Sequence, residues 1–280
     1  PWATTTGNSS CAAAGRGHNM DLEAYIRSRL DGDRRVLLMT HVIVGYPSLE
    51  ANRAMLAAMA DADVDLVELQ MPFSEPVADG PTFARANQEA LEAGLQMDDY
   101  FAFFEEAGQL CPCPRLMMGY YNPIFQMGHE AFCERLQNVG GAGFILPDLP
   151  IEEYDDLFPL SQQHGLTPIL LMPPTNHTDR LRQIGEHARG FVYAVARKGV
   201  TGSRTQMEEE GGVFDLLSRC RSATQLPLAL GFGLSKGEDL RLLHDSEADV
   251  GIVGSALLRS WEEEGEQGYA RLLTELAQAR

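Results

Sequence analysis

Two carboxylates in one short segment are the residues of this sequence best suited to acid–base chemistry. Glu68 lies within an apolar run at residues 64–71, and Asp79 follows eleven residues later in a loop stiffened by three prolines. Side chains alternate in direction along a strand, so Glu68 shares a face with Leu66. A carboxylate among buried strand residues is a candidate general acid or base, the structural alternative being a carboxylate paired within the core. For Asp79 the plainer alternative is a solvated loop residue.

Glycine-rich segments after the later apolar runs indicate a phosphate site. One runs from Arg197 to Gly202, the next is Gly231-Phe-Gly233, and the last occupies residues 251–256. In barrel enzymes, glycines after the last two strands and a short helix N-terminus hold a phosphate dianion through backbone N–H groups and the helix dipole. The sequence therefore predicts a phosphorylated ligand that is held by backbone amides rather than by Lys or Arg.

The elements that would position these groups form a repeating pattern. Eight short apolar runs alternate with helical patterns, at residues 36–44, 64–71, 116–120, 143–147, 168–172, 191–196, 226–230 and 250–253. Near-continuous apolar strands between helices indicate a parallel sheet covered on both faces, and eight such units in about 250 residues indicate a (β/α)8 TIM barrel. An open doubly wound sheet is less favoured, because no G-x-G-x-x-G turn follows the first strand.

We expect a single α/β barrel domain over residues 20–280, which begins with a short N-terminal helix at 21–30. The spacing of apolar residues also predicts one helix over 124–139 and another over 151–164. Residues 1–19 contain no acidic residue and few bulky apolar ones, which predicts a disordered leader. This leader would be a tag or the remnant of a transit peptide.

Charge and composition disfavour several classes of function. The chain carries 22 Lys and Arg against 40 Asp and Glu, a formal charge of −18, which argues against nucleic-acid and membrane-surface partners. No apolar stretch reaches about 18 residues, so no transmembrane helix is expected. The five cysteines are scattered and show no metal-ligand spacing, which indicates reduced thiols and no metal site. We therefore expect a cytoplasmic location, or an organellar one if residues 1–19 derive from a transit peptide.

The segment that contains both carboxylates has a distinctive sequence. Residues 68–81 read ELQMPFSEPVADGP, which closely resembles the signature of the tryptophan synthase α subunit. Further matching segments, in chain order, are Gly45-Tyr-Pro47, Ala86-Asn87-Gln88, Gly119-Tyr-Tyr-Asn122, Pro147-Asp148-Leu-Pro150, Gly199-Val-Thr-Gly202, Gly231-Phe-Gly233 and Gly254-Ser255. The resemblance runs from about Leu22 to the C-terminus.

This resemblance implies a lyase of the last steps of tryptophan biosynthesis, which cleaves indole-3-glycerol phosphate to indole and glyceraldehyde 3-phosphate by a retro-aldol reaction. It implies Glu68 as the general acid–base and Asp79 as the carboxylate that faces the indole nitrogen. The residues that it implies around the glycerol phosphate are Tyr193, Thr201, Gly202, Phe232, Gly233, Gly254 and Ser255. It implies no cofactor on this chain, because pyridoxal phosphate would belong to a β subunit that is the partner in an α2β2 heterotetramer.

The sequence also departs from the family pattern near the expected site. Gln70 stands where the family usually has Gly, Glu75 stands where it has Asp, and Thr40-His41-Val-Ile43 replaces a usual Pro-Phe-Val-Thr run. Gln70 and His41 would reshape the indole pocket or form hydrogen bonds to Glu68. The alternatives are a weakly active or non-catalytic α-like subunit that binds and regulates a β subunit, or another phosphate-binding barrel lyase.

Overall fold

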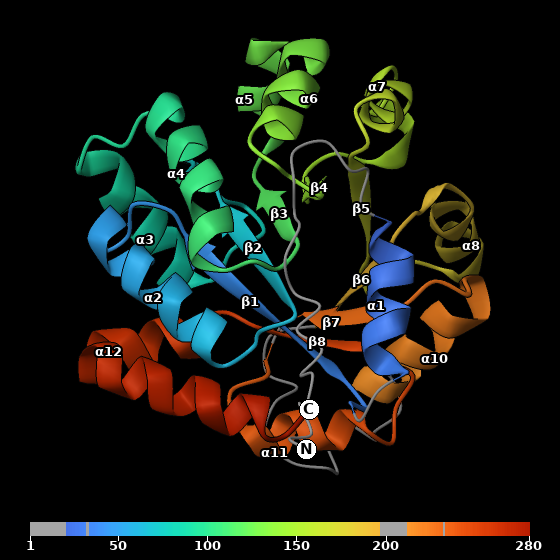
Figure 1. Cartoon of the computed structure of the whole chain (residues 1–280). Helices are drawn as coiled ribbons and strands as arrows, with labels where there is room; N and C mark the ends of the chain where they lie inside the picture. Colours follow the sequence, from blue (N-terminus) through green and yellow to red (C-terminus); the bar gives the residue numbers. More distant parts are fainter. Residues whose placement is uncertain (1–20, 32–33, 197–211, 232) are drawn as a thin grey trace, which may run out of the picture.

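Eight parallel strands close into a barrel that helices surround (Figure 1). The computed structural model describes residues 21–31, 34–196, 212–231 and 233–280. The strands are β1 (Leu37–Ile43), β2 (Leu66–Gln70), β3 (Arg115–Met118), β4 (Gly143–Ile145), β5 (Thr167–Met172), β6 (Val192–Val195), β7 (Leu228–Gly231) and β8 (Val250–Val253). Each strand pairs with the next, and β8 pairs with β1, so closure removes the sheet edges. The predicted (β/α)8 barrel is confirmed, and each predicted strand matches an observed one to within a few residues.

The helices occupy the segments between and after the strands. They are α1 (Leu22–Leu30), α2 (Leu49–Asp61), α3 (Pro81–Glu92), α4 (Met97–Leu110), α5 (Tyr121–Met127), α6 (His129–Asn138), the 3₁₀ turn η1 (Ile151–Glu153), α7 (Leu157–Gln163), α8 (Thr178–His187), α10 (Val213–Ala223), α11 (Gly237–Leu243) and α12 (Ser255–Ala277). Local sequence explains several helix starts: the Ser48 hydroxyl caps α2, and Pro81 occupies the first turn of α3. Within the described ranges, no helix is long and apolar enough to cross a membrane.

Two of the predicted helices are wrong in extent. Residues 124–139 belong to two helices, α5 and α6, because Gly128 between them has a φ of 87° that an α-helix does not allow. Residues 151–164 likewise form η1 and then α7, with Asp155 between them at a φ of 40°. Both breaks depend on the backbone conformation of one residue, which the spacing of apolar residues does not report.

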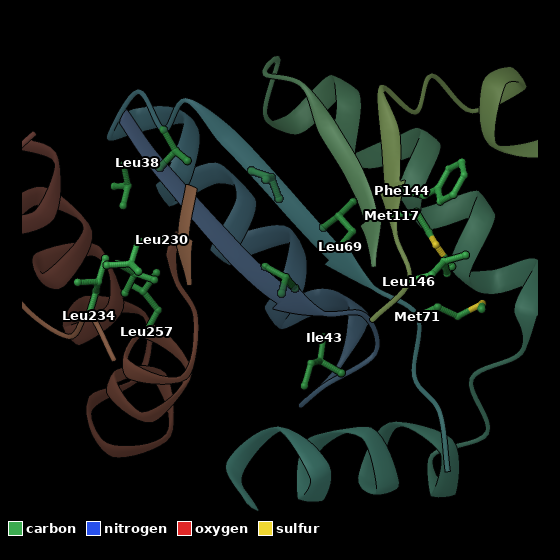
Figure 2. Close-up of a cluster of buried hydrophobic side chains, with 14 of the residues drawn as sticks. Leu38, Ile43, Leu69, Met71, Met117, Phe144, Leu146, Leu230, Leu234 and Leu257 are labelled. Atoms are coloured by element: carbon green, nitrogen blue, oxygen red, sulfur yellow. The ribbon is translucent and has the colours of Figure 1, made fainter. Parts of the chain in front are cut away.

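Alternation along the strands separates two apolar layers. Side chains such as Leu38 and Leu69 belong to the larger cluster, which packs between the strands and the surrounding helices (Figure 2). Leu66 belongs to a second cluster inside the barrel, which also contains Leu22 and Ile26 from α1. The short N-terminal helix therefore packs against the barrel interior, and Glu68, two residues beyond Leu66 on the same strand face, points into the barrel.

A buried carboxylate ties the ends of the chain to the barrel. The Asp65 side chain is fully buried and accepts a hydrogen bond from the Leu38 N–H at 2.9 Å. Arg29 Nε of α1 lies 2.9 Å from its Oδ1, Arg280 at the C-terminus lies 3.2 Å from its Oδ2, and Arg34 also binds it. The cluster joins α1, β1, β2 and the C-terminus away from the cavity described below.

Candidate active site

A cavity of about 290 Å³ lies among the segments at the carboxyl ends of the strands. Four of the predicted site residues line it, namely Tyr193, Gly233, Gly254 and Ser255. The other lining residues are His41, Gly80, Pro81, Thr82, Phe83, Leu234, Ser235, Ile252 and Arg259. Of the other five predicted residues, Glu68 and Asp79 are described below, and Thr201, Gly202 and Phe232 lie outside the described residues.

The loops after β7 and β8 form one wall of this cavity, and their backbone requires glycine. Gly233 has a φ of 100°, in the region that only glycine enters at no steric cost. A Cβ at Gly254 would lie 2.7 Å from Phe83 Cζ and 3.0 Å from His41 Cβ, so a side chain there would require Phe83 to move. Ser255 begins α12, whose first-turn N–H groups lack partners within the helix. Such a helix N-terminus beside a glycine loop suits an anion.

Arg259 on α12 also lines the cavity, although the sequence prediction placed no cation there. It follows Ser255 by one helical turn, and side chains at this spacing share a helix face. The guanidinium forms no ion pair with any residue in the described part of the chain. A positive charge is therefore available at the end of the cavity with the glycine loops.

Glu68 is buried inside the barrel beside β1, with 2% of its surface exposed. In the register of β1 and β2 it is the partner of His41, whose Nδ1 lies 3.3 Å from Glu68 Oε1. Its other oxygen, Oε2, is buried and has no hydrogen-bond partner in the described structure. The structural alternative, a carboxylate paired within the core, thus accounts for one oxygen only. A buried acceptor without a partner is rare, and it leaves Oε2 available for proton exchange with a ligand.

Asp79 is half-buried in the loop between β2 and α3. Its Oδ2 accepts hydrogen bonds from Gln70 Nε2 at 2.7 Å and from Asn87 Nδ2 at 3.1 Å. Burial raises the pKa of Asp79 above its usual value, and the hydrogen bond from Gln70 opposes this change. The Ala78 N–H donates to the Tyr120 hydroxyl at 3.2 Å, which fixes the loop next to the carboxylate.

Gln70 and His41 connect the two carboxylates. His41 Nε2 lies 2.7 Å from Gln70 Oε1, so contacts run from Glu68 through His41 and Gln70 to Asp79. Burial lowers the pKa of His41, but the carboxylates of Glu68 and Asp79 outweigh burial, and the pKa is raised above its usual value. The imidazole also stacks on Phe83 with 4.5 Å between ring centroids. As expected from the sequence, His41 contacts Glu68, whereas Gln70 binds Asp79 instead.

Tyr193 on β6 borders the cavity and also lies close enough to both carboxylates for their charges to affect its pKa. Its phenol is 8% exposed and borders the cavity. Burial raises the pKa of Tyr193 well above its usual value, and the charges of Glu68 and Asp79 raise it further. In the described part of the chain, neither carboxylate is itself a wall residue of the cavity; His41 lies at the wall and contacts Glu68.

Asn87 is a second residue of this site, after Arg259, whose role the sequence did not reveal. It is fully buried on α3, where Nδ2 donates to the Phe83 carbonyl at 2.8 Å and Oδ1 accepts from the Phe73 N–H at 3.0 Å. These backbone contacts orient its amide toward Asp79. The only signal in the sequence was its place in one of the motifs of the family resemblance.

Comparison with known proteins identifies one family. Residues 28–280 match the family model described as "Tryptophan synthase alpha chain". The chain belongs to this family. The tryptophan synthase alpha chain of Syntrophotalea carbinolica is 45% identical over 244 residues, which cover 87% of this chain and 95% of the relative. That of Desulforapulum autotrophicum is 42% identical over 256 residues, or 91% of this chain and 100% of the relative.

Solved structures of the family have the same barrel. Tryptophan synthase from Mycobacterium tuberculosis superposes with a TM-score of 0.83 at 32% identity, covering 92% of this chain and 97% of the solved one. The tryptophan synthase complex from Pyrococcus furiosus gives 0.77 at 28% identity, covering 86% and 98%. The resemblance read from the motifs is confirmed, and with it the role of an α-subunit lyase in tryptophan biosynthesis. The α chain needs no cofactor, since pyridoxal phosphate belongs to the β subunit.

Proposed function

We propose that the chain cleaves indole-3-glycerol phosphate to indole and glyceraldehyde 3-phosphate, with Glu68 and Asp79 as its acid–base groups. The observation that carries this proposal is the unpartnered Oε2 of Glu68, buried in the barrel and joined through His41 to a cavity of about 290 Å³. Sites for small ligands are concave, mostly apolar and supplied with a few convergent polar groups. The same cavity carries an anion-binding wall, which suits a substrate with an apolar ring and a phosphate.

Glu68 can carry both proton transfers of the reaction, and Asp79 can stabilise the charge that develops on the ring. Glu68 donates a proton to C3 of the indole ring, which makes the ring an electron sink. The bond between C3 and C3′ then breaks, its electron pair passes to the ring, and the C3′ hydroxyl returns a proton to Glu68 as the aldehyde forms. Asp79 accepts the indole N–H and stabilises the positive charge that develops on the ring.

The phosphate would occupy the end of the cavity lined by Gly233, Gly254 and Ser255. The N-terminus of α12 supplies N–H donors there, and Arg259 adds a positive charge. Tyr193, which stays protonated because burial raises its pKa, can donate a hydrogen bond to the glycerol part. The resemblance alone supports three further contacts in this region, namely Thr201, Gly202 and Phe232.

Replacement of Glu68 by Gln tests the proposal, because it keeps the size of the side chain and removes the proton carrier. Indole release by the purified chain, with and without a β subunit, should fall by about 10²-fold or more. Binding of indole-propanol phosphate should persist and report an intact cavity. The matched control is Glu105→Gln on the exposed surface of α4, which should leave the rate unchanged. An equal rate for Glu68→Gln and the control would reject Glu68 as the acid–base group.

A β subunit is the proposed partner, in an α2β2 complex. Val77 is 81% exposed after β2, and Phe125 is 61% exposed on α5 after β3, so both lie in segments that follow neighbouring strands. Because β2 and β3 pair in the barrel, we place the interface at this part of the rim, where exposed apolar side chains can add contacts to a partner. Val77→Asp and Phe125→Asp should weaken co-elution with the β subunit while indole release by the isolated chain stays the same. Unchanged co-elution of both variants would place the interface elsewhere.

We further infer one catalytic domain over residues 20–280, in the cytoplasm, preceded by a leader at residues 1–19. The absence of acidic residues from the leader supports this division, and it also fits a tag or a transit-peptide remnant, which would place the chain in an organelle. A chain that starts at Met20 should keep the full rate of indole release. A loss of activity in this shortened chain would assign the leader to the catalytic domain.

A further inference from the structure

We propose that His41 and Gln70 join Glu68 and Asp79 into one acid–base unit, in which His41 shares a single proton with Glu68. The inference rests on the proposed roles of the two carboxylates and adds two positioning residues to them. Both are departures from the family pattern, so the unit is a property of this chain rather than of the motifs that identify the family. Its basis is the direction of the hydrogen bonds that lead from Asn87 to His41, together with the 3.3 Å contact between His41 Nδ1 and Glu68 Oε1.

Backbone atoms set the first of these directions. The Phe73 N–H can only donate and the Phe83 carbonyl can only accept, so Asn87 must place Oδ1 at Phe73 and Nδ2 at Phe83. Gln70 Nε2 lies 3.3 Å from Asn87 Oδ1 and 2.7 Å from Asp79 Oδ2, and both of these atoms are acceptors. The amide of Gln70 therefore presents its NH₂ group to Asp79.

The orientation of Gln70 then fixes the protonation of the imidazole. With its NH₂ group turned to Asp79, Gln70 presents only Oε1 to His41, at 2.7 Å from Nε2. An amide oxygen accepts and never donates, so His41 Nε2 carries the hydrogen. The other ring nitrogen, Nδ1, is left to face Glu68 Oε1 at 3.3 Å.

One proton then has two positions. It lies either on His41 Nδ1, beside an ionised Glu68, or on Glu68 Oε1, beside a neutral imidazole. Interacting groups of this kind titrate as a pair rather than as separate residues. In both states the hydrogen bond from Nε2 to Gln70 Oε1 holds the ring in place, so the transfer needs no rotation of the imidazole.

The charges around His41 favour retention of this proton by the pair. The groups that act on the charge of His41 are the carboxylates of Glu68 and Asp79 and the amide of Gln70, while Tyr193 and Arg259 line the same cavity as His41. The two carboxylates raise the pKa of His41 above its usual value near 6.5 despite burial. Because a raised pKa keeps the imidazole protonated below it, the proton is lost only as pH rises through that raised value.

The proton shared by His41 and Glu68 is the one that the proposed reaction needs for its first step. Cleavage begins with donation to the indole ring, so a Glu68 that is ionised at rest must first obtain a proton. His41 transfers that proton to Oε1, and a half-turn of the carboxyl group about its Cγ–Cδ bond then carries the proton to the unpartnered position of Oε2, where it faces the ring. When the C3′ hydroxyl gives its proton to Glu68, the pair returns to its starting state.

Nitrogen-15 NMR of the imidazole groups tests the unit without catalysis. The His41 signal is assigned by its loss in His41→Phe. We expect His41 to titrate above the usual range near 6.5, and to keep the hydrogen on Nε2 when neutral. Glu68→Gln should lower its pKa, and Gln70→Gly should remove the preference for the Nε2–H tautomer. Titration in the usual range, indifferent to Glu68→Gln, would overturn the proposal even if Glu68 proves essential for indole release.

Kinetics supply a second test that a purely structural role would not satisfy. His41→Phe and Gln70→Gly should each lower kcat by about 10-fold to 10²-fold, a larger factor than any rise in KM, and shift the basic limb of the pH profile to lower pH. The double variant should be no worse than the poorer single one, because each change disconnects the same unit. His41→Gln, which keeps a donor toward Glu68, should recover part of kcat without restoring the basic limb.

Phe83→Leu is the matched control, because it removes the stacking on His41 and leaves the hydrogen bonds intact. It should change KM or the free energy of unfolding and leave the pH profile in place. Losses in His41→Phe and Gln70→Gly that multiply in the double variant, with an unshifted basic limb, would show that the two residues act independently and would reject the shared proton.

Discussion

Gly231 at the end of β7 is the position where one methyl group tests the cavity most directly. A Cβ at this position would lie 2.1 Å from Tyr193 Cε1 and 2.5 Å from its hydroxyl oxygen. Ordinary contacts begin near 3.4 Å, so Gly231→Ala requires the phenol ring to move by about an ångström. Tyr193 is 8% exposed and borders the cavity, so the cavity offers the ring room to move.

The cost follows from the packing. Inserting a methyl group into a filled core costs about 1–3 kcal/mol, so the free energy of unfolding should fall by that amount. An ångström of displacement in a substrate-contacting group lowers catalytic efficiency by up to about 10²-fold. Urea unfolding followed by circular dichroism measures the first quantity, and steady-state indole release measures the second.

A double-mutant cycle tests whether the Tyr193 ring causes the loss of stability in Gly231→Ala. Tyr193→Ala removes the ring, and in that background Gly231→Ala should cost less than about 0.5 kcal/mol, because the new methyl group enters the space left behind. The interaction between the two changes then accounts for most of the cost. If Gly231→Ala destabilises both backgrounds equally, the methyl group meets something other than Tyr193, and the contact inferred from the structure is refuted.

Two further outcomes concern charged groups. Asp65→Asn should lower the free energy of unfolding by about 3–5 kcal/mol in urea titrations, because it leaves Arg29, Arg34 and Arg280 without their buried carboxylate; an effect below about 1 kcal/mol would contradict this. Asp79 has a raised pKa in the folded chain, so its contribution to stability should decline as pH rises from the unfolded value near 3.9 through the folded one. In Asp79→Asn, the free energy of unfolding should therefore change less with pH over this range. A steeper decline in the variant would show that the pKa of Asp79 is lowered, not raised, by folding.

The barrel could be predicted from the sequence because the pattern of an apolar run followed by a helix occurs eight times. A wrong boundary in one repeat does not change the predicted fold. Apolar runs identified each strand, and alternation alone placed Glu68 on the interior face beside Leu66. The same reasoning failed at Gly128, where one residue with a positive φ divides a continuous helical pattern. Glycine marks such breaks only when its φ is known, and spacing does not supply φ.

Four of the predicted site residues line one cavity, whereas the hydrogen bonds that connect the side chains of the site were not predicted. Glycine loops after β7 and β8 were assigned to a phosphate, and Gly233 and Gly254 do line the cavity. The contact between Gln70 and Asp79 spans nine residues and depends on how the intervening loop folds back. That path is set by backbone contacts such as the one between Ala78 and Tyr120 of a neighbouring strand's loop, which no local pattern encodes.

The acidic composition and the phosphate ligand are reconciled by how charge is distributed in the cavity. The whole chain carries a formal charge of −18, yet α12 directs its N-terminus and Arg259 at the cavity. At the other end, Glu68 and Asp79 would together place two negative charges near a dianion. A protonated His41 between them and the wall at Gly254 reduces that to one. The shared proton thus serves binding as well as chemistry. Its loss at high pH would leave Glu68 without a proton to donate and would restore the repulsion between the two carboxylates and the phosphate.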